Sequence, residues 1–96
     1  MTERELQKAV ATLAERLGWR VAELTSATRT SGFPDLALIY PPRLVFVEPK
    51  NARKNPDFAE ATWLNSLDEI PNVESYVWRP EDLVAGRVEY VLRYGP

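Results

Sequence analysis

Two short apolar segments on either side of a proline pair constrain the fold of this chain most strongly. Residues 35–40 and 44–48 are rich in strand-forming side chains, and Pro41-Pro42 lies between them. Because proline cannot donate a ladder hydrogen bond, the pair is expected in a turn rather than inside a strand. The two segments are therefore predicted to form a hairpin.

The position of this turn decides which side chains face each other. A turn centred on the proline pair places Asp35 opposite Glu48, with Cβ atoms roughly 4.5–5.5 Å apart. Lys50 lies two residues beyond Glu48 and joins the same face if the strand stays extended that far. The same turn gives two further pairs, Ile39 with Leu44 and Ala37 with Phe46.

Two directly opposed carboxylates indicate a cation-binding site. Asp35 and Glu48 would repel each other unless something compensates their charge. A divalent cation does so well, because Mg²⁺ takes one or two carboxylates from a protein and keeps several waters. A metal-bound water is a good nucleophile, and Lys50 would stabilise charge that builds up on a phosphate. The hypothesis is metal-assisted phosphodiester hydrolysis.

A plainer interpretation of the same residues stays open. An aspartate before a strand is often a turn or cap residue, and Glu48 with Lys50 would then be a solvated pair at a strand end. The two interpretations differ in whether the three side chains converge.

Capping residues and hydrophobic spacing predict the other elements. Thr2 and Glu5 form a capping box at the start of a helix, Gly18 ends it, and Gly86 weakens the last helix. The predicted order is a helix from 2 to 18, a strand at 19–24, a loop at 25–33, the hairpin, a basic loop at 51–55, a helix from Pro56 to about residue 69, a strand at 74–78 and a helix from Pro80. This αβββαβα order predicts one α/β domain, residues 1–96, with a small mixed sheet flanked by helices.

Composition excludes several kinds of chemistry. The chain has no Cys and no His, so zinc fingers, thiol nucleophiles and a histidine base are ruled out. Carboxylates, lysine, hydroxyls and an oxygen-preferring metal remain. The sequence has no signal peptide and no apolar run long enough to span a membrane, so we expect a cytoplasmic protein with no membrane partner.

The charges are unevenly distributed along the chain. The net charge is −2, whereas nucleic-acid-binding proteins are usually basic. Yet between residues 29 and 54 there are only two acids, Asp35 and Glu48, against five bases: Arg29, Arg43, Lys50, Arg53 and Lys54. After residue 54 eight acids face three arginines. The basic middle favours a phosphate-facing surface, although ordinary solvated surface explains it too.

These blocks together resemble a known family. Gly32-Phe33-Pro34-Asp35, an apolar strand and then Val47-Glu48-Pro49-Lys50 resemble the PD-(D/E)xK nuclease superfamily. Within it the chain is similar to the stand-alone VRR-NUC domains of phage and bacteria. The flanking blocks that strengthen the resemblance are Gly18-Trp19-Arg20, Trp63-Leu64 and Val77-Trp78-Arg79-Pro80.

The resemblance implies roles for individual residues. It implies a restriction-endonuclease-like αβββαβ core and a Mg²⁺ ion, replaceable by Mn²⁺, on Asp35, Glu48 and the backbone carbonyl of Pro49. It implies Lys50 as the catalytic lysine and a glutamate near the start of the first helix. Glu3 and Glu5 both fit that description. Glu5 already serves the capping box, and Glu3 shares the stripe that faces the sheet, so we choose Glu3.

Two positions depart from the family pattern. Pro49 stands where an aliphatic residue is usual; it keeps its carbonyl but has no N–H, so it could end the strand and rotate Lys50 away. Glu60 stands where relatives often carry Gln lining the active site. A carboxylate there would weaken phosphate binding or add a metal ligand, or else face solvent.

Five residues are candidates for contact with DNA phosphates: Arg29, Thr30, Ser31, Arg53 and Lys54. They lie in the loops before the first hairpin strand and after Lys50, where simple loop chemistry is the alternative. The resemblance implies a DNA endonuclease selective for branched DNA, including four-way (Holliday) junctions, that works as a homodimer. Two alternatives remain: a nucleic-acid-binding module of the same fold with impaired catalysis, and a structural adaptor.

Overall fold

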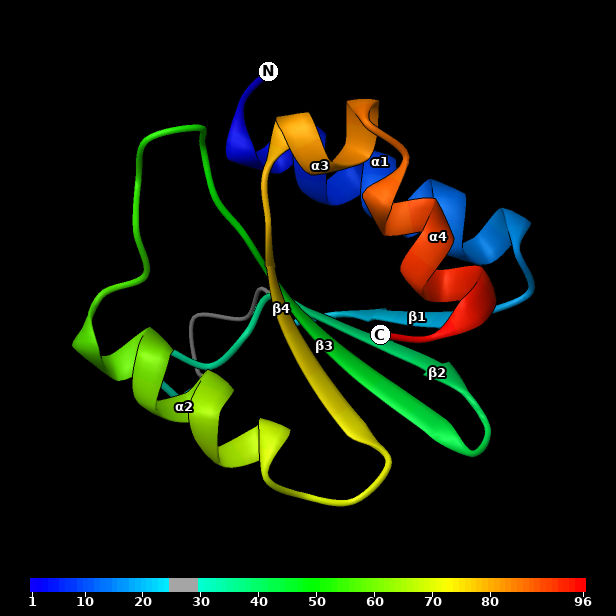
Figure 1. Ribbon diagram of the computed structural model, residues 1–96. Helices are drawn as coiled ribbons and strands as arrows, with labels where there is room; N and C mark the ends of the chain where they lie inside the picture. The colour runs from blue at the N-terminus through cyan, green and yellow to red at the C-terminus, as the bar shows by residue number, and fades with distance from the viewer. Residues whose placement is uncertain (25–29) are drawn as a thin grey trace.

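A computed structural model describes residues 1–24 and 30–96 and shows a four-stranded sheet between helices (Figure 1). The strand order follows the chain, and the four strands are β1 (Arg20–Glu23), β2 (Leu36–Tyr40), β3 (Arg43–Pro49) and β4 (Val73–Trp78). The first three strands pair antiparallel, whereas β4 is parallel to β3. The small mixed sheet predicted from the sequence is confirmed.

The hairpin has the register that the proline pair predicted. The two pairs Ile39 with Leu44 and Ala37 with Phe46 are both present. Regular pairing ends where Leu36 faces Val47, so Asp35 lies one residue before β2 and the predicted pair of Asp35 with Glu48 is not part of the described ladder. Its N–H donates to the Val47 carbonyl at 3.1 Å, and this hydrogen bond holds Asp35 at the end of the β2–β3 ladder.

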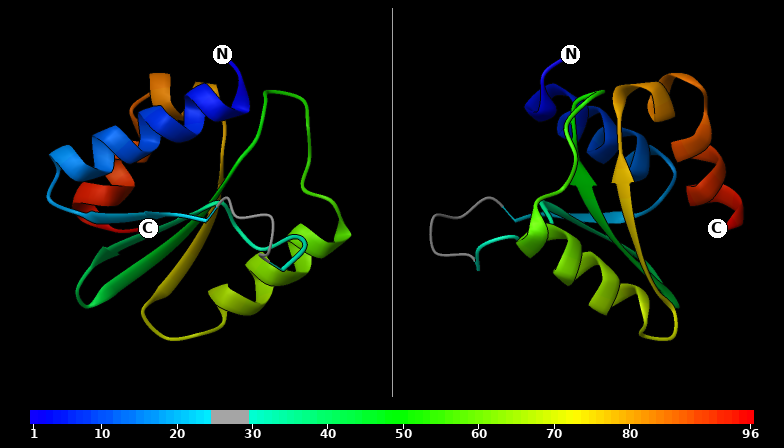
Figure 2. Two further views of the ribbon diagram at one scale, coloured as in Figure 1. Left: turned by 180° about the vertical axis from the view of Figure 1, so that it is seen from behind. Right: turned by 60° about the vertical axis from the view of Figure 1, so that its left-hand side comes forward.

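The helices cover both faces of the sheet. On one face lie α1 (Glu3–Arg16), α3 (Pro80–Val84) and α4 (Arg87–Tyr94), and on the other lies α2 (Phe58–Asp68) (Figures 1 and 2). As predicted, α1 starts with the Thr2–Glu5 capping box, and Gly18, at φ +92°, follows its end. None of the described helices has the length and the apolar character needed to cross a membrane.

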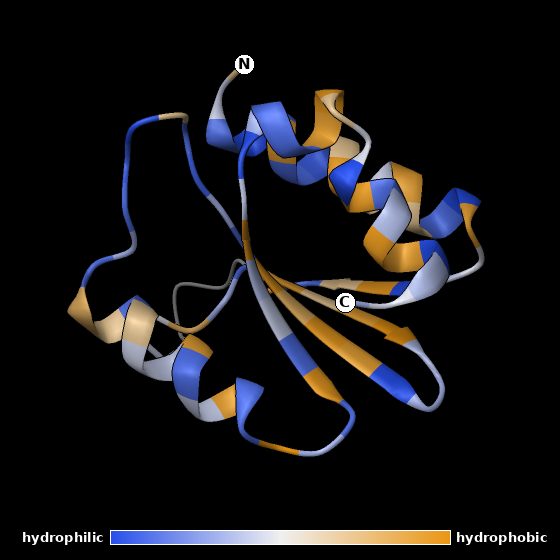
Figure 3. Ribbon diagram, in the orientation of Figure 1, coloured by the Kyte–Doolittle hydropathy of each residue, from blue (hydrophilic) through white to orange (hydrophobic). Residues whose placement is uncertain are grey.

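The main core lies between the sheet and the layer of α1 and α4. Figure 3 shows hydrophobic residues along β2 and β3 and on the helix surfaces near them. Full burial of each Leu or Val contributes about 1.5–3 kcal/mol, so this layer supplies most of the packing energy. The buried residues of this core are Leu6, Val10, Ala14, Trp19, Leu36, Leu38, Val45, Val47, Trp78, Val88 and Leu92.

Two boundary predictions are wrong. Pro56 is not the first residue of a helix: Asp57 is the N-cap and Phe58 begins α2. The side chain of Asp57 caps the helix in a box with Glu60, and Pro56 precedes that cap. The single C-terminal helix is instead two helices, because Gly86 has a φ of +80°, which no right-handed helix contains.

Candidate active site

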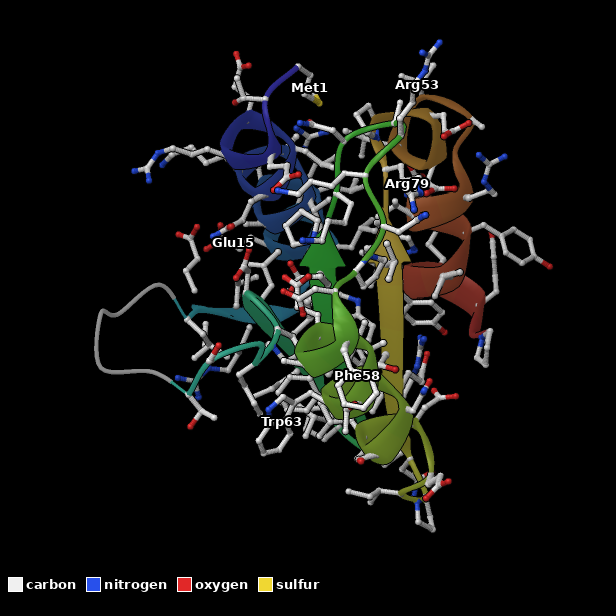
Figure 4. All side chains as sticks on the ribbon, turned by 90° about the vertical axis from the view of Figure 1, so that its left-hand side faces the viewer. Met1, Glu15, Arg53, Phe58, Trp63 and Arg79 are labelled. Carbon is white, nitrogen blue, oxygen red and sulfur yellow. The ribbon has the colours of Figure 1, made fainter. Side chains whose placement is uncertain are left out.

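The predicted site residues lie where β3 meets the first turn of α2. Glu48 is in β3, Lys50 follows its end, Asp35 precedes β2, and Glu60 is in the first turn of α2. Figure 4 views the molecule from this side, with the loop bearing Arg53 at the top and α2 below. Three elements far apart in the sequence therefore contribute charged side chains to one place.

Lys50 lies between two carboxylates. Its Nζ is 2.9 Å from Oε2 of Glu60 and 3.4 Å from Oε2 of Glu48. Glu48 is 3% exposed and Lys50 is 4% exposed, so the pair is buried rather than solvated at a strand end. The prediction that Lys50 shares the face of Glu48 agrees with these contacts.

Pro49 does not turn Lys50 away, and the hydrogen bonds of β3 explain why. The N–H groups of Leu44 and Lys50 donate to β4-side carbonyls, at 3.1 Å to Asn72 and 3.0 Å to Trp78. Peptide groups alternate along a strand, so those of Val47 and Pro49 point to the opposite edge, as the Asp35–Val47 bond shows. Pairing there ends at Leu36, so the missing N–H of Pro49 removes no bond of the described ladder. Its carbonyl points to the edge that carries Asp35.

The negative charge of the buried Glu48 is only partly compensated by its surroundings. Its Oε1 is buried and has no hydrogen-bond partner within the described part of the chain. Burial, and then the negative charges of Asp35 and Glu60, raises the pKa of Glu48 to about 8, although Lys50 opposes this rise. Burial and the neighbouring negative charges therefore favour the protonated form of this carboxyl group, and a bound cation would favour the ionised form.

Lys50 and Glu60 stabilise each other as charged groups. Burial disfavours the Lys50 ammonium, but the hydrogen bond to Glu60 and the charges of Glu48 and Glu60 raise its pKa above the ordinary value. Burial likewise opposes the charge of Glu60, yet the N–H of Asp57 and the Lys50 ammonium together lower the pKa of Glu60. Glu60 thus lines the site and does not face solvent.

The donor set fits a hard divalent cation. The charge of Asp35 acts on Glu48 and, after burial, is the largest cause of its raised pKa, and the unpartnered Oε1 of Glu48 is an available ligand. Among the described residues, no three acidic side chains are grouped so that they could hold a metal ion by themselves. Two carboxylates and the carbonyl of Pro49 form a smaller set, which suits Mg²⁺ because that ion keeps several waters.

Glu3 contacts the loop after Lys50. Its Oε2 accepts the N–H of Asn51 at 3.3 Å, one residue beyond the lysine. Glu3 belongs to the stripe of α1 that continues with the buried Leu6, Gln7 and Val10, as the helical spacing predicted. This contact fixes the backbone next to the site, and a direct role at the metal stays a prediction.

The loop that follows Lys50 is held from a second side by Arg79. The guanidinium donates to the carbonyls of Asn51 and Lys54, both at 2.6 Å, and to Oδ1 of Asn55 at 3.1 Å. Arg53 and Lys54 are exposed, and within the described residues neither forms an ion pair. The loop therefore has an ordered backbone and two cationic side chains open to a partner.

The other predicted phosphate contacts are placed less completely. Thr30 and Ser31 are exposed in the loop before β2, and Arg29 lies outside the described residues. Arg43, counted in the basic middle of the sequence, is not at this surface. Its guanidinium binds Glu74 at the far end of β3, so that part of the charge argument is wrong.

Two contacts near the site escaped the sequence reasoning. Gly32 has a φ of +82°, and a Cβ there would come within 2.7 Å of the Ala59 Cβ and 2.8 Å of the Ala59 carbonyl carbon. The glycine thus lets the loop touch the first turn of α2. The Asp57–Glu60 capping box was also missed, although the spacing D-x-x-E before an apolar segment signals one.

Comparison with known proteins finds one informative likeness. A solved structure of a VRR-NUC domain has a TM-score of 0.70 with this chain and 26% sequence identity. The match covers 96% of this chain and 95% of the other. No family model matches the sequence, and no curated protein matches it either. The likeness extends over nearly the whole of both chains, including the sheet and the helices that carry the site.

Proposed function

We propose that the chain is a nuclease that hydrolyses DNA phosphodiester bonds with Mg²⁺, because its α/β fold is similar over 96% of its length to that of a VRR-NUC domain. The observation that carries this proposal is the buried Glu48: its Oε1 has no hydrogen-bond partner among the described residues, its Oε2 lies 3.4 Å from Lys50, and the charge of Asp35 acts on it. A buried carboxylate whose charge is not compensated lowers the stability of the fold, unless a bound cation compensates that charge. A divalent cation is the ligand that this donor set fits.

Each residue has a distinct proposed role. Asp35, Glu48 and the Pro49 carbonyl would hold the Mg²⁺, or Mn²⁺ as a substitute. When bound, the ion supplies Lewis acidity and lowers the pKa of a coordinated water. Lys50 orients the phosphate and stabilises its developing negative charge through its ammonium group. Glu48 would hold the ion as an ionised carboxylate, with its proton released to solvent, because that is the form that binds a cation.

We propose that the loop after Lys50 binds the DNA backbone. Arg53 and Lys54 project from a backbone that Arg79 and Glu3 hold in place, and Thr30 and Ser31 add hydroxyl donors. Such contacts position a duplex without reading its sequence. Selection would then depend on the shape of the DNA, and we propose branched substrates, including four-way junctions.

A cleavage panel tests this function. Duplex, flap, splayed and four-way DNA are incubated with Mg²⁺, with Mn²⁺ and with a chelator. Cleavage is expected only with metal, and Lys50→Ala should lower turnover by about 10²-fold, as removal of one electrostatic stabiliser does. Binding of DNA without cleavage under every condition would contradict the nuclease proposal and favour the alternative, a binding module of the same fold.

We also propose that the chain forms a homodimer through α3 and α4. Three large side chains on these helices are strongly exposed: Val84 at 87%, Tyr90 at 61% and Tyr94 at 72%. A two-fold interface would cover them and would add phosphate contacts from two subunits. Light scattering at micromolar concentration should report twice the chain mass. A Tyr90→Glu variant should be monomeric, and a monomeric wild-type protein would contradict the proposal.

A further inference from the structure

We propose that Glu60 is a positioning residue, which holds the ammonium of Lys50 in place by attaching it to the capped first turn of α2. The expected kinetic effect rests on the proposed nuclease function. The contact itself does not, and it is tested separately below.

Both oxygens of the Glu60 carboxylate have fixed partners. Oε1 accepts the backbone N–H of Asp57 at 2.9 Å, and Oε2 accepts the Lys50 ammonium at 2.9 Å. The N–H of Glu60 in turn donates to Oδ1 of Asp57 at 2.8 Å. The backbone N–H of Asp57 therefore sets the orientation of the carboxylate, and the carboxylate sets the position of the lysine.

The first turn of α2 is a firm support for this contact. Gly32 lies against Ala59 and Glu60 so closely that an added Cβ would clash with their backbone. Further along the helix, the hydroxyl of Ser75 in β4 donates to the Leu64 carbonyl at 2.7 Å. Because α2 is fixed to a loop on one side and to the sheet on the other, Glu60 has a fixed position and can hold Lys50 there.

Glu60 is needed because Glu48 cannot bind both the proposed metal ion and the Lys50 ammonium equally well. Glu48 is the more distant partner of Lys50, at 3.4 Å, and it is the carboxylate proposed to bind the metal. Once its charge is used there, Glu60 is the carboxylate left to hold the ammonium. A lysine side chain has many rotamers, so without the Glu60 contact the ammonium of Lys50 would be held less firmly in position.

Glu60→Gln separates the two tasks of this side chain. Glutamine has one acceptor oxygen and one NH₂ donor. If its oxygen keeps the capping bond to Asp57, its NH₂ faces the Lys50 ammonium, which can only donate. With its single acceptor the variant keeps the shape but can serve only one of the two donors, and in either orientation the charged contact with the lysine is lost. Asp57→Ala is the matched control, since it removes the N-cap side chain but keeps the Glu60 carboxylate and the backbone N–H that binds it.

The first experiment measures kinetics with Mg²⁺. Glu60→Gln is expected to lower kcat by about 10- to 10²-fold, as misplacement of a catalytic group does, with KM little changed. Asp57→Ala is expected to retain wild-type kcat. Equal or faster turnover in Glu60→Gln overturns the proposal. A similar loss in Asp57→Ala also overturns it, because the role of Glu60 would then be helix stability alone.

The second experiment needs neither metal nor activity. The metal-free proteins are treated with an amine-acetylating reagent, and modification of Lys50 is followed by peptide mass spectrometry. Lys50 should react faster in Glu60→Gln than in wild type and Asp57→Ala, with Lys8 as internal reference. Equal rates in wild type and Glu60→Gln overturn the proposal. If Lys50 reacts more slowly in the wild type than in Glu60→Gln but the wild type cleaves no DNA, the nuclease function is contradicted while the positioning contact stands.

Discussion

The two ends of β3 each place a cation among carboxylates, and their partners differ. At the first end, Arg43 binds both oxygens of Glu74 at 2.7 Å and donates to the carbonyls of Val91 and Leu92 at the end of α4. Tyr76 donates its hydroxyl to the same carboxylate at 2.7 Å. One positive charge faces one negative charge, and the cluster is compensated.

The second end of β3 is not compensated. One ammonium, that of Lys50, faces the carboxylates of Glu48 and Glu60, and the charge of Asp35 acts on Glu48 as well. One carboxylate oxygen has no partner within the described residues. The contrast teaches that burial of charge alone does not mark a functional site. Excess charge of one sign, with an unsatisfied atom, distinguishes the end that would bind a cation from the end that stabilises the fold.

The largest expected difference between the two ends is in catalysis. Glu48→Gln and Asp35→Asn should each lower Mg²⁺-dependent cleavage by about 10³-fold or more, since each removes a proposed metal ligand. Both variants should unfold at the wild-type temperature or slightly above it, because repulsion is relieved. Glu74→Gln should cleave at the wild-type rate. Cleavage assays and thermal unfolding check this, and wild-type activity in Glu48→Gln would refute the site.

The next effect concerns stability at the Arg43 end. Arg43→Met should lower the free energy of unfolding by about 2–3 kcal/mol, because it leaves Glu74 and the carbonyls of α4 without their shared donor. Turnover per folded molecule should be unchanged. Urea unfolding followed by Trp fluorescence provides the measurement. A loss of activity in folded Arg43→Met would show that the two ends are coupled.

The pH dependence of stability should have opposite signs at the two ends. The pKa of Glu48 is raised to about 8. Its contribution to the free energy of unfolding is therefore complete below about pH 4.5 and is lost as pH rises through 8. Burial opposes the charge of Glu74, but Arg43 and Tyr76 lower its pKa overall. Its contribution is therefore present above pH 4.5 and is lost as pH falls through the lowered pKa.

Urea titrations of the metal-free protein between pH 5 and 9 test this contrast. Glu48→Gln should remove part of the decline that wild type shows as pH rises toward 8, whereas Glu74→Gln should leave that decline intact. An identical slope in wild type and Glu48→Gln would show that Glu48 ionises normally in the folded protein.

The smallest expected effect is on DNA binding by the loop after Lys50. Arg53→Gln and Lys54→Gln should each reduce the slope of log binding constant against log salt by about 1, the value for one lost phosphate contact. Arg93→Gln, on α4 and paired with Glu89, is the control and should not change the slope. Fluorescence anisotropy at several salt concentrations measures it. Unchanged slopes in both loop variants would exclude the loop from the interface.

The sequence by itself determined the features that depend on neighbours along the chain. The proline pair set the register of the hairpin, the Thr2–Glu5 box began α1, and the alternation along β3 placed Lys50 on the face of Glu48. These follow from backbone stereochemistry over a few residues. The same local signals failed at Pro56 and Gly86, where a cap and a left-handed glycine moved the ends of helices.

The tertiary structure decided which distant charges meet. The spacing of residues 43, 74 and 92 does not predict that Arg43 binds Glu74 and the end of α4, away from the proposed phosphate surface. Likewise, Glu60 reaches Lys50 because Gly32 lets α2 approach the end of the sheet. Such contacts depend on how a helix packs against a sheet, which is a long-range property set by the whole core rather than by local sequence.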